Sequence, residues 1–202
     1  MRLLQALGLI VFLAAGAAAG VAQADSWLTG RVLVASEHMS DPRFQETVIY
    51  LVDHDENGAF GLVVNKPIST GPIEGLLDRL GIDLDDEDLG ALRGGSITLH
   101  YGGPVQPEIG FLLHSAEYAI RGTRVLSGAF ALTTNLEALI DVAFGYGPRR
   151  SLLIFGYSGW GPSQLESELA RGDWAVIDAD PDLVLGTDHE SKWRRSLGGI
   201  II

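Results

Sequence analysis

The stretch FGYSGWGPSQLESEL, residues 155–169, holds the pattern closest to a catalytic motif in this chain. A serine nucleophile on a sharp strand-to-helix turn requires the spacing G-x-S-x-G, with small residues around the serine. In Gly156-Tyr157-Ser158-Gly159-Trp160, the apolar run before the serine and the helical pattern after it fit, but a tryptophan stands where a small residue is needed. We predict that Ser158 lies in a strand-to-helix bend and has no catalytic base.

A serine hydrolase remains the enzymatic alternative. The order Ser-Asp-His can be assembled from Ser158, Asp178 and His189, which is the order of triad residues in α/β hydrolases. The spacing between this serine and histidine is short for such enzymes. The chain also lacks an HGGG-type segment upstream that would form an oxyanion hole.

The glycines around Ser158 also have a structural explanation. Gly156, Gly159 and Gly161 would permit a tight bend, with Trp160 filling the gap beneath it, because glycine adopts a positive φ at little cost. We therefore expect Gly159→Val or Gly161→Val to destabilise the fold and Ser158→Ala to change it little.

The same bend leads into a predicted helix, whose first N–H groups could hold a carboxylate or a phosphate. Glu166 and Glu168 follow in this helix and would repel an anion that they faced. Anion binding and a purely structural bend both remain open.

The segment DHDENG, residues 53–58, matches the first half of a calcium-binding loop through Asp53, Asp55, Asn57 and Gly58. The bidentate glutamate required at position twelve is replaced by Val64, and the flanks read as strands, so a hairpin turn explains the same residues. His54 could instead belong to a zinc or manganese site. The remaining histidines are scattered without a metal-binding spacing: His38, His100, His114 and His189. We predict no metal and no cofactor.

The stretch YGGPV, residues 101–105, is the second glycine-rich turn. Gly102, Gly103 and Pro104 predict a rigid turn at which another backbone passes closely. Such a loop could also line a cleft, because binding residues concentrate on loops held by a rigid scaffold. Asn65, which ends the apolar run FGLVVN, completes the set of candidate pocket residues.

Strands and helices are predicted from apolar periodicity and from turn and cap residues. Strands are expected at 30–36, 47–53, 60–65, 96–103, 108–115, 124–134, 150–158, 174–180 and 181–186. Helices are expected at 73–82, in part of 83–95, and at 135–145, 162–172 and 189–198. We expect Asn57-Gly58 to close a hairpin between 47–53 and 60–65, and 96–103 to pair with 108–115. Strands in neighbouring pairs with helices between the pairs predict an α+β fold with a mainly antiparallel sheet.

The composition excludes several chemistries. The chain of 202 residues has no cysteine, which removes disulfides, thiolate metal sites and cysteine nucleophiles. Its formal net charge of −12 opposes direct binding of nucleic acid, because phosphate contacts need clustered lysine and arginine. The acidic run DLDDEDL, residues 83–89, predicts a solvated face, with attraction of cations or basic partners as the alternative.

The N-terminus predicts export. Residues 1–24 comprise one early arginine, an apolar stretch and a final Ala22-Gln23-Ala24, which is typical of a secretory signal peptide cut after Ala24. The alternative is an uncleaved membrane anchor, because the apolar stretch approaches the ~20 residues that span a bilayer. No second run of that length follows, so we expect residues 25–202 to form one periplasmic domain that does not span the membrane.

Several ordered motifs together resemble those of the YqgE/AlgH family of bacterial proteins. They are GRVLVAS, then M-x-D-P-x-F, TVIYLVDHDENGAFGLVVNKP, YGGPV, GYSGWGPSQLESEL and a tryptophan-containing strand. The resemblance covers roughly residues 27–198. It implies an α+β fold with a bulged, strongly coiled antiparallel sheet folded on itself like a half-barrel. It implies no reaction; a regulatory role, as in control of alginate production, is associated with some members.

The leader is a departure from the family, whose members look cytoplasmic and usually begin near the first strand. A cytoplasmic location by family analogy is therefore the alternative to the periplasm. We predict a non-enzymatic binding or regulatory module that acts through contact with a protein or a small ligand. The alternatives are a hydrolase that uses Ser158 or a metal near His54, and a transcription-linked regulator by family analogy.

Overall fold

The computed structural model describes residues 27–82, 85–93, 95–126 and 128–198. The predicted signal peptide, residues 1–24, lies outside the described residues. Within the described ranges, no helix is both long and apolar enough to cross a bilayer.

Strands and helices follow one another along the chain as follows. The strands are β1 (Arg31–Ala35), β2 (Val48–Asp55), β3 (Gly58–Val63), β4 (Pro67–Pro72), β5 (Ser96–Tyr101), β6 (Val105–Ser115), β7 (Arg124–Val125), β8 (Phe130–Thr133), β9 (Ser151–Trp160) and β10 (Trp174–Asp178). The helices are α1 (Ile73–Arg79), α2 (Asp86–Ala91), α3 (Leu136–Phe144), α4 (Gln164–Ala170), α5 (Pro181–Val184) and α6 (Lys192–Leu197).

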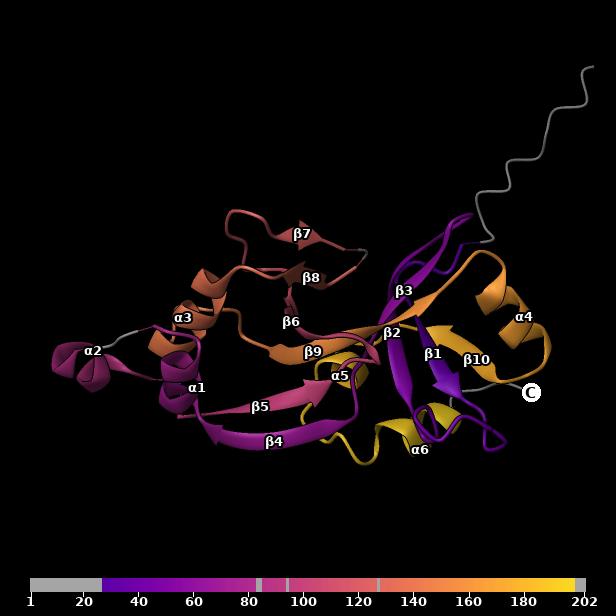
Figure 1. Cartoon of the computed structure of the whole chain (residues 1–202), viewed down its shortest axis with the longest axis horizontal. Helices are drawn as coiled ribbons and strands as arrows, with labels where there is room; N and C mark the ends of the chain where they lie inside the picture. The colour runs from indigo at the N-terminus through magenta and orange to yellow at the C-terminus, as the bar shows by residue number, and fades with distance from the viewer. Residues whose placement is uncertain (1–26, 83–84, 94, 127, 199–202) are drawn as a thin grey trace, which may run out of the picture.

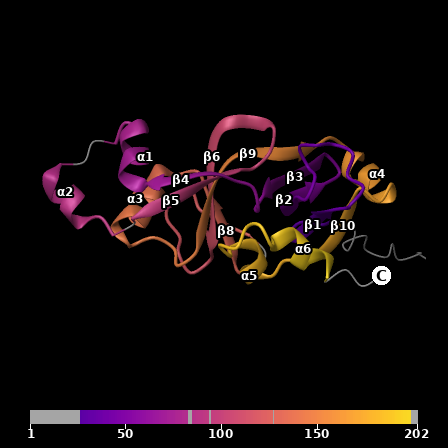
Figure 2. The same cartoon turned by 90° about the horizontal axis from the view of Figure 1, so that it is seen from below.

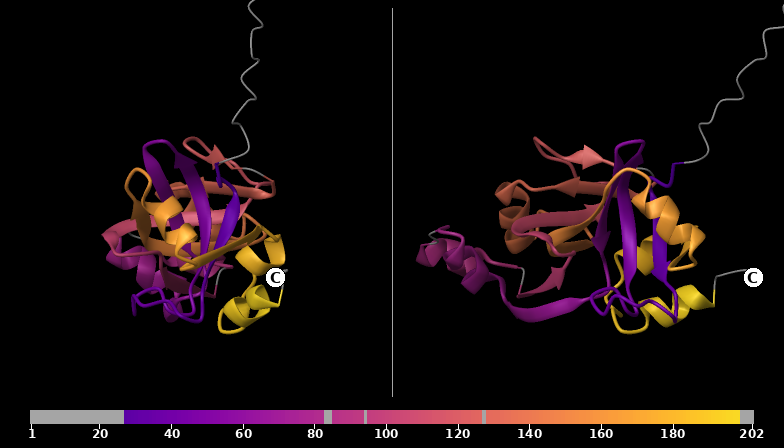
Figure 3. Two further views of the ribbon diagram at one scale, coloured as in Figure 1. Left: turned by 90° about the vertical axis from the view of Figure 1, so that its right-hand side faces the viewer. Right: turned by 45° about the vertical axis from the view of Figure 1, so that its right-hand side comes forward.

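The strands form one curled, mainly antiparallel sheet in the order β10-β1-β2-β3-β9-β6-β8-β7, to which β5 and β4 are added beside β9. Figure 1 shows β9 crossing the middle of the molecule, with β1, β2, β3, β10 and α4 on one side and β4, β5, α1 and α2 on the other. In Figure 2, α5 and α6 follow one another along one side of the molecule. In the right-hand view of Figure 3, α2 (magenta) and α4 (orange) lie at opposite ends of the molecule. The predicted α+β half-barrel is confirmed.

Strand β9 joins the two halves because it pairs with three other strands. Its last residues, 158–160, pair with β3, whereas residues 153–155 run parallel to β5 and residues 151–157 run antiparallel to β6. Gly156 has a φ of 71°, a left-handed conformation that suits glycine at a bulge. The strand can therefore bend from one half of the sheet into the other.

The predicted hairpin of β2 and β3 is confirmed, with Asp55 opposite Gly58. The loop residues are Glu56 and Asn57, so the turn begins one residue earlier than the Asn-Gly pair suggested. The carboxylate of Asp55 accepts the N–H of Asn57 at 2.7 Å, which stabilises the turn locally.

Helix α3 is also confirmed together with both of its predicted ends. The Asn135 side chain accepts the N–H of Glu137 at 2.9 Å, and Gly145 ends the helix with a φ of 79°.

Two predictions of local structure are wrong. Strands β5 and β6 do not pair with each other, because β9 lies between them and pairs with both. Residues 181–186 were expected to form a strand, but Pro181–Val184 form helix α5. The carboxylate of Asp180 accepts the N–H groups of Asp182 and Leu183, and Pro181 stands at the first helical position, where its missing N–H costs nothing.

Three apolar clusters fill the space around the sheet. One lies between the two halves of the sheet around Tyr50 and Phe130, whose ring centroids are 4.8 Å apart. A second contains Trp160, Trp174 and Leu165 beside α4. The third packs α1 and α3 against β6 and β9. Each half of the sheet thus has its own packed side, and β9 contributes residues to all three clusters.

The turn between β5 and β6 lies against β9, as predicted. A Cβ placed on Gly102 would come within 2.2 Å of the carbonyl oxygen of Gly156, and one on Gly103 would come equally close to the backbone of Tyr157. Gly103 also has a φ of 148°. This crossing of two backbone segments, the Gly102–Gly156 crossing, therefore has room only for glycine.

The expectation for Gly161 is contradicted. It has no positive φ, and a Cβ there would meet only the Gln164 side chain, at 3.9 Å. Gly159 has no positive φ either, but a Cβ there would lie 3.3 Å from the Tyr157 ring, closer than most Cβ contacts, so the expected cost of Gly159→Val is not contradicted. The glycines at which a side chain would clash with the backbone come earlier in the chain, at Gly102, Gly103 and Gly156.

We predict that Gly103→Ala lowers the free energy of unfolding by at least about 3 kcal/mol, because the methyl group adds both a clash and an unfavourable φ. Gly161→Ala should change it by less than about 1 kcal/mol. Urea denaturation of both variants measures the difference. Equal loss of stability in the two would show that the crossing is not the constraint.

Candidate functional site

A polar pocket of about 320 Å³ lies where four segments of the chain meet. We call it the tryptophan pocket. The segments are the loop after β1, the turn after β5, the end of β9 with α4, and the start of β10. Its lining residues are Met39, Ser40, Asp41, Arg43, Phe44, Pro104, Gly159, Trp160, Gln164, Glu168, Arg171, Asp173 and Trp174.

The carboxylate of Glu168 organises the pocket. Its Oε2 accepts the indole N–H of Trp160 and that of Trp174, each at 2.8 Å. Its Oε1 accepts the side-chain amide of Gln164 at 2.9 Å. All three donors are neutral groups, so these hydrogen bonds fix the position of the carboxylate without pairing it with a cation. The pocket therefore has one rigid anionic group at its wall.

Local sequence places these groups together. Gln164 and Glu168 are four residues apart in α4 and share one face of the helix. The Gln164 side chain also accepts the N–H of Gly161 at 3.1 Å, so it meets one of the unpaired donors that precede the helix. Trp174 begins β10, where it stands opposite Ala35 of β1. Helix α4 thus bridges β9 and β10 and carries the carboxylate that both tryptophans need.

Two arginine–aspartate pairs frame the opening. Arg43 bonds Asp41, and Arg171 bonds Asp173 at 2.6 Å. The hydrogen bond from Arg43 holds the pKa of Asp41 below its usual value. The two arginine side chains are 58% and 59% exposed, so each guanidinium still presents donors to solvent and to anything that enters the pocket.

The candidate residues predicted from the sequence separate into groups. Pro104, Gly159 and Trp160 line the tryptophan pocket. Gly102, Gly103 and Gly156 belong to the backbone crossing. Tyr157 packs its ring against Phe60 and Phe111, at centroid distances of 4.8 and 6.3 Å.

Ser158 lies inside β9 and not in a bend, so that part of the prediction is wrong; the strand continues to Trp160. The bend follows at residues 161–163. The Ser158 side chain is 1% exposed, and its hydroxyl donates to the carbonyl of Gly102 at 3.2 Å. Asp178 instead pairs with Arg31, and His189 contacts His100. The three residues of the possible triad therefore have separate partners.

His54 and Asp53 are not brought together with Ser158. The Nδ1 of His54 accepts the N–H of Leu28 at 3.0 Å, so its Nε2 carries the proton and donates to Glu166 at 3.1 Å. Asp53 pairs with Arg124 at 3.1 Å. Among the described residues, no three histidine, aspartate or glutamate side chains are grouped so as to hold a metal ion.

Asn65 has a structural role in this fold. Its side-chain oxygen accepts the N–H of Val48 at 2.9 Å, and its amide donates to the carbonyl of Glu46 at 2.8 Å. Glu46 has a positive φ of 51°. The buried amide thus fixes the entry into β2, and it is not among the residues that line the tryptophan pocket.

Sequence reasoning missed most of the pocket. Glu168 was considered only as a charge that repels anions, and Arg43, Arg171 and Trp174 were not proposed as site residues. One signal in the sequence could have indicated the pocket: several motifs that are far apart in the chain each contain both aromatic and charged residues. The M-x-D-P-x-F segment carries the family resemblance, and Trp174 begins a predicted strand, but neither is predicted as a site.

A second cluster of polar side chains lies between the sheet and the segment that contains α5 and α6. The Nδ1–H of His100 donates to the carbonyl of Leu153 at 3.2 Å, and its Nε2 faces the Nε2 of His189 at 3.3 Å. Lys192 is fully buried and donates to the carbonyls of Val64 and Val184. Burial, and then the charges of Arg150 and Arg195, lower the pKa of Lys192 to about 7. This cluster ties α5 and α6 to the sheet.

The fold and the motifs together define a half-barrel protein with a polar pocket where its motifs meet. The chain belongs to the AlgH-like family, whose model matches residues 32–201. It is 42% identical to a UPF0301 protein of Ruegeria pomeroyi over 172 residues, covering 84% of this chain and 90% of that one. It is also 42% identical to a UPF0301 protein of Burkholderia cenocepacia, covering 85% and 87%.

Solved structures agree with this assignment. The AlgH protein from Pseudomonas aeruginosa aligns with a TM-score of 0.70 and 35% identity, over 88% of this chain and 92% of that one. A protein from Corynebacterium diphtheriae aligns with a TM-score of 0.65 at 18% identity, over 87% and 88%, which is a likeness of fold alone.

We predict that His100 makes stability fall with acid. Burial, and then the charge of His189, lower the pKa of His100 from 6.5 to about 4. Between pH 6.5 and pH 4, His100 is protonated in the unfolded chain but not in the folded chain. The free energy of unfolding therefore falls as the pH is lowered from 6.5 to 4. The loss should be of the order of 2 kcal/mol.

Urea denaturation between pH 7 and 4.5 measures this loss. His100→Gln should reduce the slope, whereas His38→Gln, at an exposed histidine, should leave it unchanged. A slope that is the same in all three proteins would contradict the assignment to His100.

Proposed function

We propose that this protein is a non-enzymatic binding module whose contact site is the tryptophan pocket, where it takes a polar small ligand or a polar segment of a partner protein. The observation that carries the proposal is convergence. Three motifs that are far apart in the sequence line this one pocket: the loop around Asp41, the turn at Pro104 and the stretch at Trp160.

Size and chemistry support the same function. A volume of about 320 Å³ falls within the range of small-molecule sites, roughly 300–1,000 Å³. The wall carries a fixed carboxylate at Glu168 and exposed guanidinium groups at Arg43 and Arg171. Such a wall suits a ligand with both hydrogen-bond donors and an anionic group, because donors would face Glu168 and the anion would face an arginine.

The surroundings of Ser158 favour binding over hydrolysis. A nucleophile must reach its substrate and must have a base within hydrogen-bond distance. The Ser158 hydroxyl is buried and is used in a hydrogen bond to Gly102. The alternative of a metal near His54 is weakened in the same way, since both of its ring nitrogens already have partners.

A regulatory role through partner contact is consistent with this proposal, but direct contact with nucleic acid is not part of it. The net charge of −12 would repel a phosphate backbone. Regulation would instead follow from occupancy of the tryptophan pocket.

The test is photo-crosslinking in the native cell. With p-benzoylphenylalanine at Ser40, in the pocket, intact-mass analysis should show a discrete adduct. The same residue at Tyr146, which is 78% exposed and does not line the pocket, should not give it. Arg43→Ala or Arg171→Ala should reduce the Ser40 adduct at least about tenfold, the effect of losing ~1.4 kcal/mol of binding.

The matched control is Arg149→Ala, because Arg149 is also an exposed arginine facing a carboxylate, that of Glu117. It should leave the adduct unchanged. An adduct that is equally strong at Ser40 and Tyr146, or that survives both pocket substitutions, would refute the proposed site.

We further propose that the protein acts in the periplasm, with residues 1–24 removed and residues 25–202 forming one domain. The support is the sequence pattern that ends in Ala22-Gln23-Ala24. Cell fractionation and intact mass should find a periplasmic chain that begins at Asp25. A cytosolic chain that begins at Met1, as expected for a typical family member, would contradict this proposal.

A further inference from the structure

A second cavity, separate from the tryptophan pocket, lies between α1, α3 and the strands β6 and β9. We call it the leucine pocket. We propose that it binds a compact, uncharged apolar molecule of the size of one substituted aromatic ring. Its lining residues are Leu80, Glu108, Gly110, Leu112, Thr133, Thr134, Asn135, Leu136, Leu139, Leu153 and Phe155.

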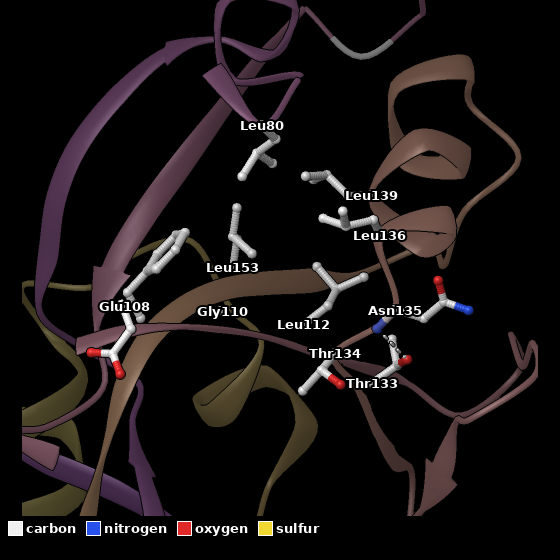
Figure 4. A pocket seen from close by; sticks show the side chains of 11 residues that line it. Leu80, Glu108, Gly110, Leu112, Thr133, Thr134, Asn135, Leu136, Leu139 and Leu153 are labelled. Carbon is white, nitrogen blue, oxygen red and sulfur yellow. Dashed lines mark hydrogen bonds between the residues drawn. The ribbon is translucent and has the colours of Figure 1, made fainter. Parts of the chain in front are cut away.

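Leucine side chains from several elements point into one space. Figure 4 shows Leu80 at the end of α1 facing Leu136 and Leu139 of α3, with Leu112 of β6 and Leu153 of β9 below them in this view. The strands hold their two leucines directly opposite each other, since Leu112 pairs with Leu153. The walls are therefore set by helices and strands, which give a cavity of stable shape.

Part of this apolar lining is open to solvent. Leu80 is 39% exposed and Leu136 is 47% exposed. Both are at helix ends, Leu80 just after α1 and Leu136 at the start of α3. A ligand would cover these leucines at the mouth of the cavity, and removing their apolar surface from water would favour binding.

The volume sets the size of the ligand. The cavity measures about 180 Å³. An engineered apolar cavity of about 150 Å³ stays dry and binds benzene. The leucine pocket therefore suits a benzene ring with one or two further heavy atoms. It is too small for a long acyl chain or a nucleotide.

Two polar side chains at the helical end of the pocket, those of Thr133 and Asn135, already have partners within the protein. The Thr133 hydroxyl accepts the N–H of Asn135 at 3.1 Å. The Asn135 side chain accepts the N–H of Glu137 and donates to the carbonyl of Arg121. Affinity must therefore come from apolar contact, with few hydrogen bonds to the ligand.

The negative charge at the rim of the leucine pocket disfavours binding of anions. Among the described residues that line the pocket, Glu108 carries the single ionisable side chain, and none is a lysine or arginine that would balance it. Figure 4 shows its carboxylate turned away from the leucines. A ligand carboxylate would lose its hydration on entry and meet this negative charge, so an uncharged molecule is preferred over its carboxylate analogue.

The test is a titration of the protein with ¹³C-labelled leucine methyl groups. Benzyl alcohol, an uncharged ring of the expected size, should shift the methyl signals of Leu139 and Leu153 with saturation. Benzoate, its anionic counterpart, should bind at least fivefold more weakly. Glu108→Gln should narrow that difference without weakening benzyl alcohol.

Gly110→Val should fill the leucine pocket. A Cβ on Gly110 would contact the ring of Phe155 at 3.4 Å, an ordinary distance, and Gly110 has no positive φ. Binding of benzyl alcohol should fall at least tenfold. The matched control is Gly71→Val in strand β4, where a Cβ would meet nothing within 4 Å; its binding should equal that of the wild type.

A second pair of variants remains informative if Gly110→Val does not fold. Leu136→Glu places a charge at the mouth and should also weaken binding at least tenfold. Ile68→Glu makes the same change at a residue that is 61% exposed on β4, and it should have no effect. Three results would each overturn the proposal. The methyl shifts could fail to saturate or be uniform over the protein, benzoate could bind as tightly as benzyl alcohol, or Leu136→Glu could leave binding unaffected.

Discussion

The Gly102–Gly156 crossing is the constraint on which the rest of the structure depends. Strand β9 must leave β5 and β6 and continue along β3, so it bends at Gly156 while the turn after β5 passes against it. The N–H of Gly102 donates to Phe155 at 2.8 Å, and its carbonyl accepts Val63 at 3.1 Å. One glycine thus links β9 to β3 by hydrogen bonds that a side chain on it would prevent. The half-barrel shape follows from this contact.

Local signals were sufficient for most of the fold. The cap and stop residues of α3, the β2–β3 turn and the apolar runs of β1 and β10 each act within a few residues, so the sequence predicts them well. The predicted pairing of β5 with β6 is wrong, because nothing near residues 96–115 indicates that a strand about fifty residues later lies between them. The apolar run PDLVLG favours a strand, but Asp180 and Pro181 form a standard helix start, and the cap decides the structure of α5.

The candidate site was predicted only in part, for a related reason. Glycine-rich turns can be recognised in sequence because backbone conformation is a local property. The role of Glu168 depends on Trp160 and Trp174, and these three groups meet only after α4 has bridged β9 and β10. Ser158 shows the converse case. A strand, a serine and glycines occur in the order of a nucleophile elbow, yet the strand continues past the serine and its hydroxyl is used within the sheet.

The two pockets share β9 but lie on opposite sides of its bulge. Leu153 and Phe155 line the leucine pocket before Gly156, whereas Gly159 and Trp160 line the tryptophan pocket after it. Since the crossing fixes both segments of the strand, a substitution there must disturb both pockets and the stability of the fold together. Exposed side chains at the rims of the pockets, such as Arg43 and Leu136, contribute little to the stability of the fold. Rim substitutions can therefore separate binding at either pocket from folding, whereas loss of function caused by glycine substitutions at the crossing says nothing about a ligand.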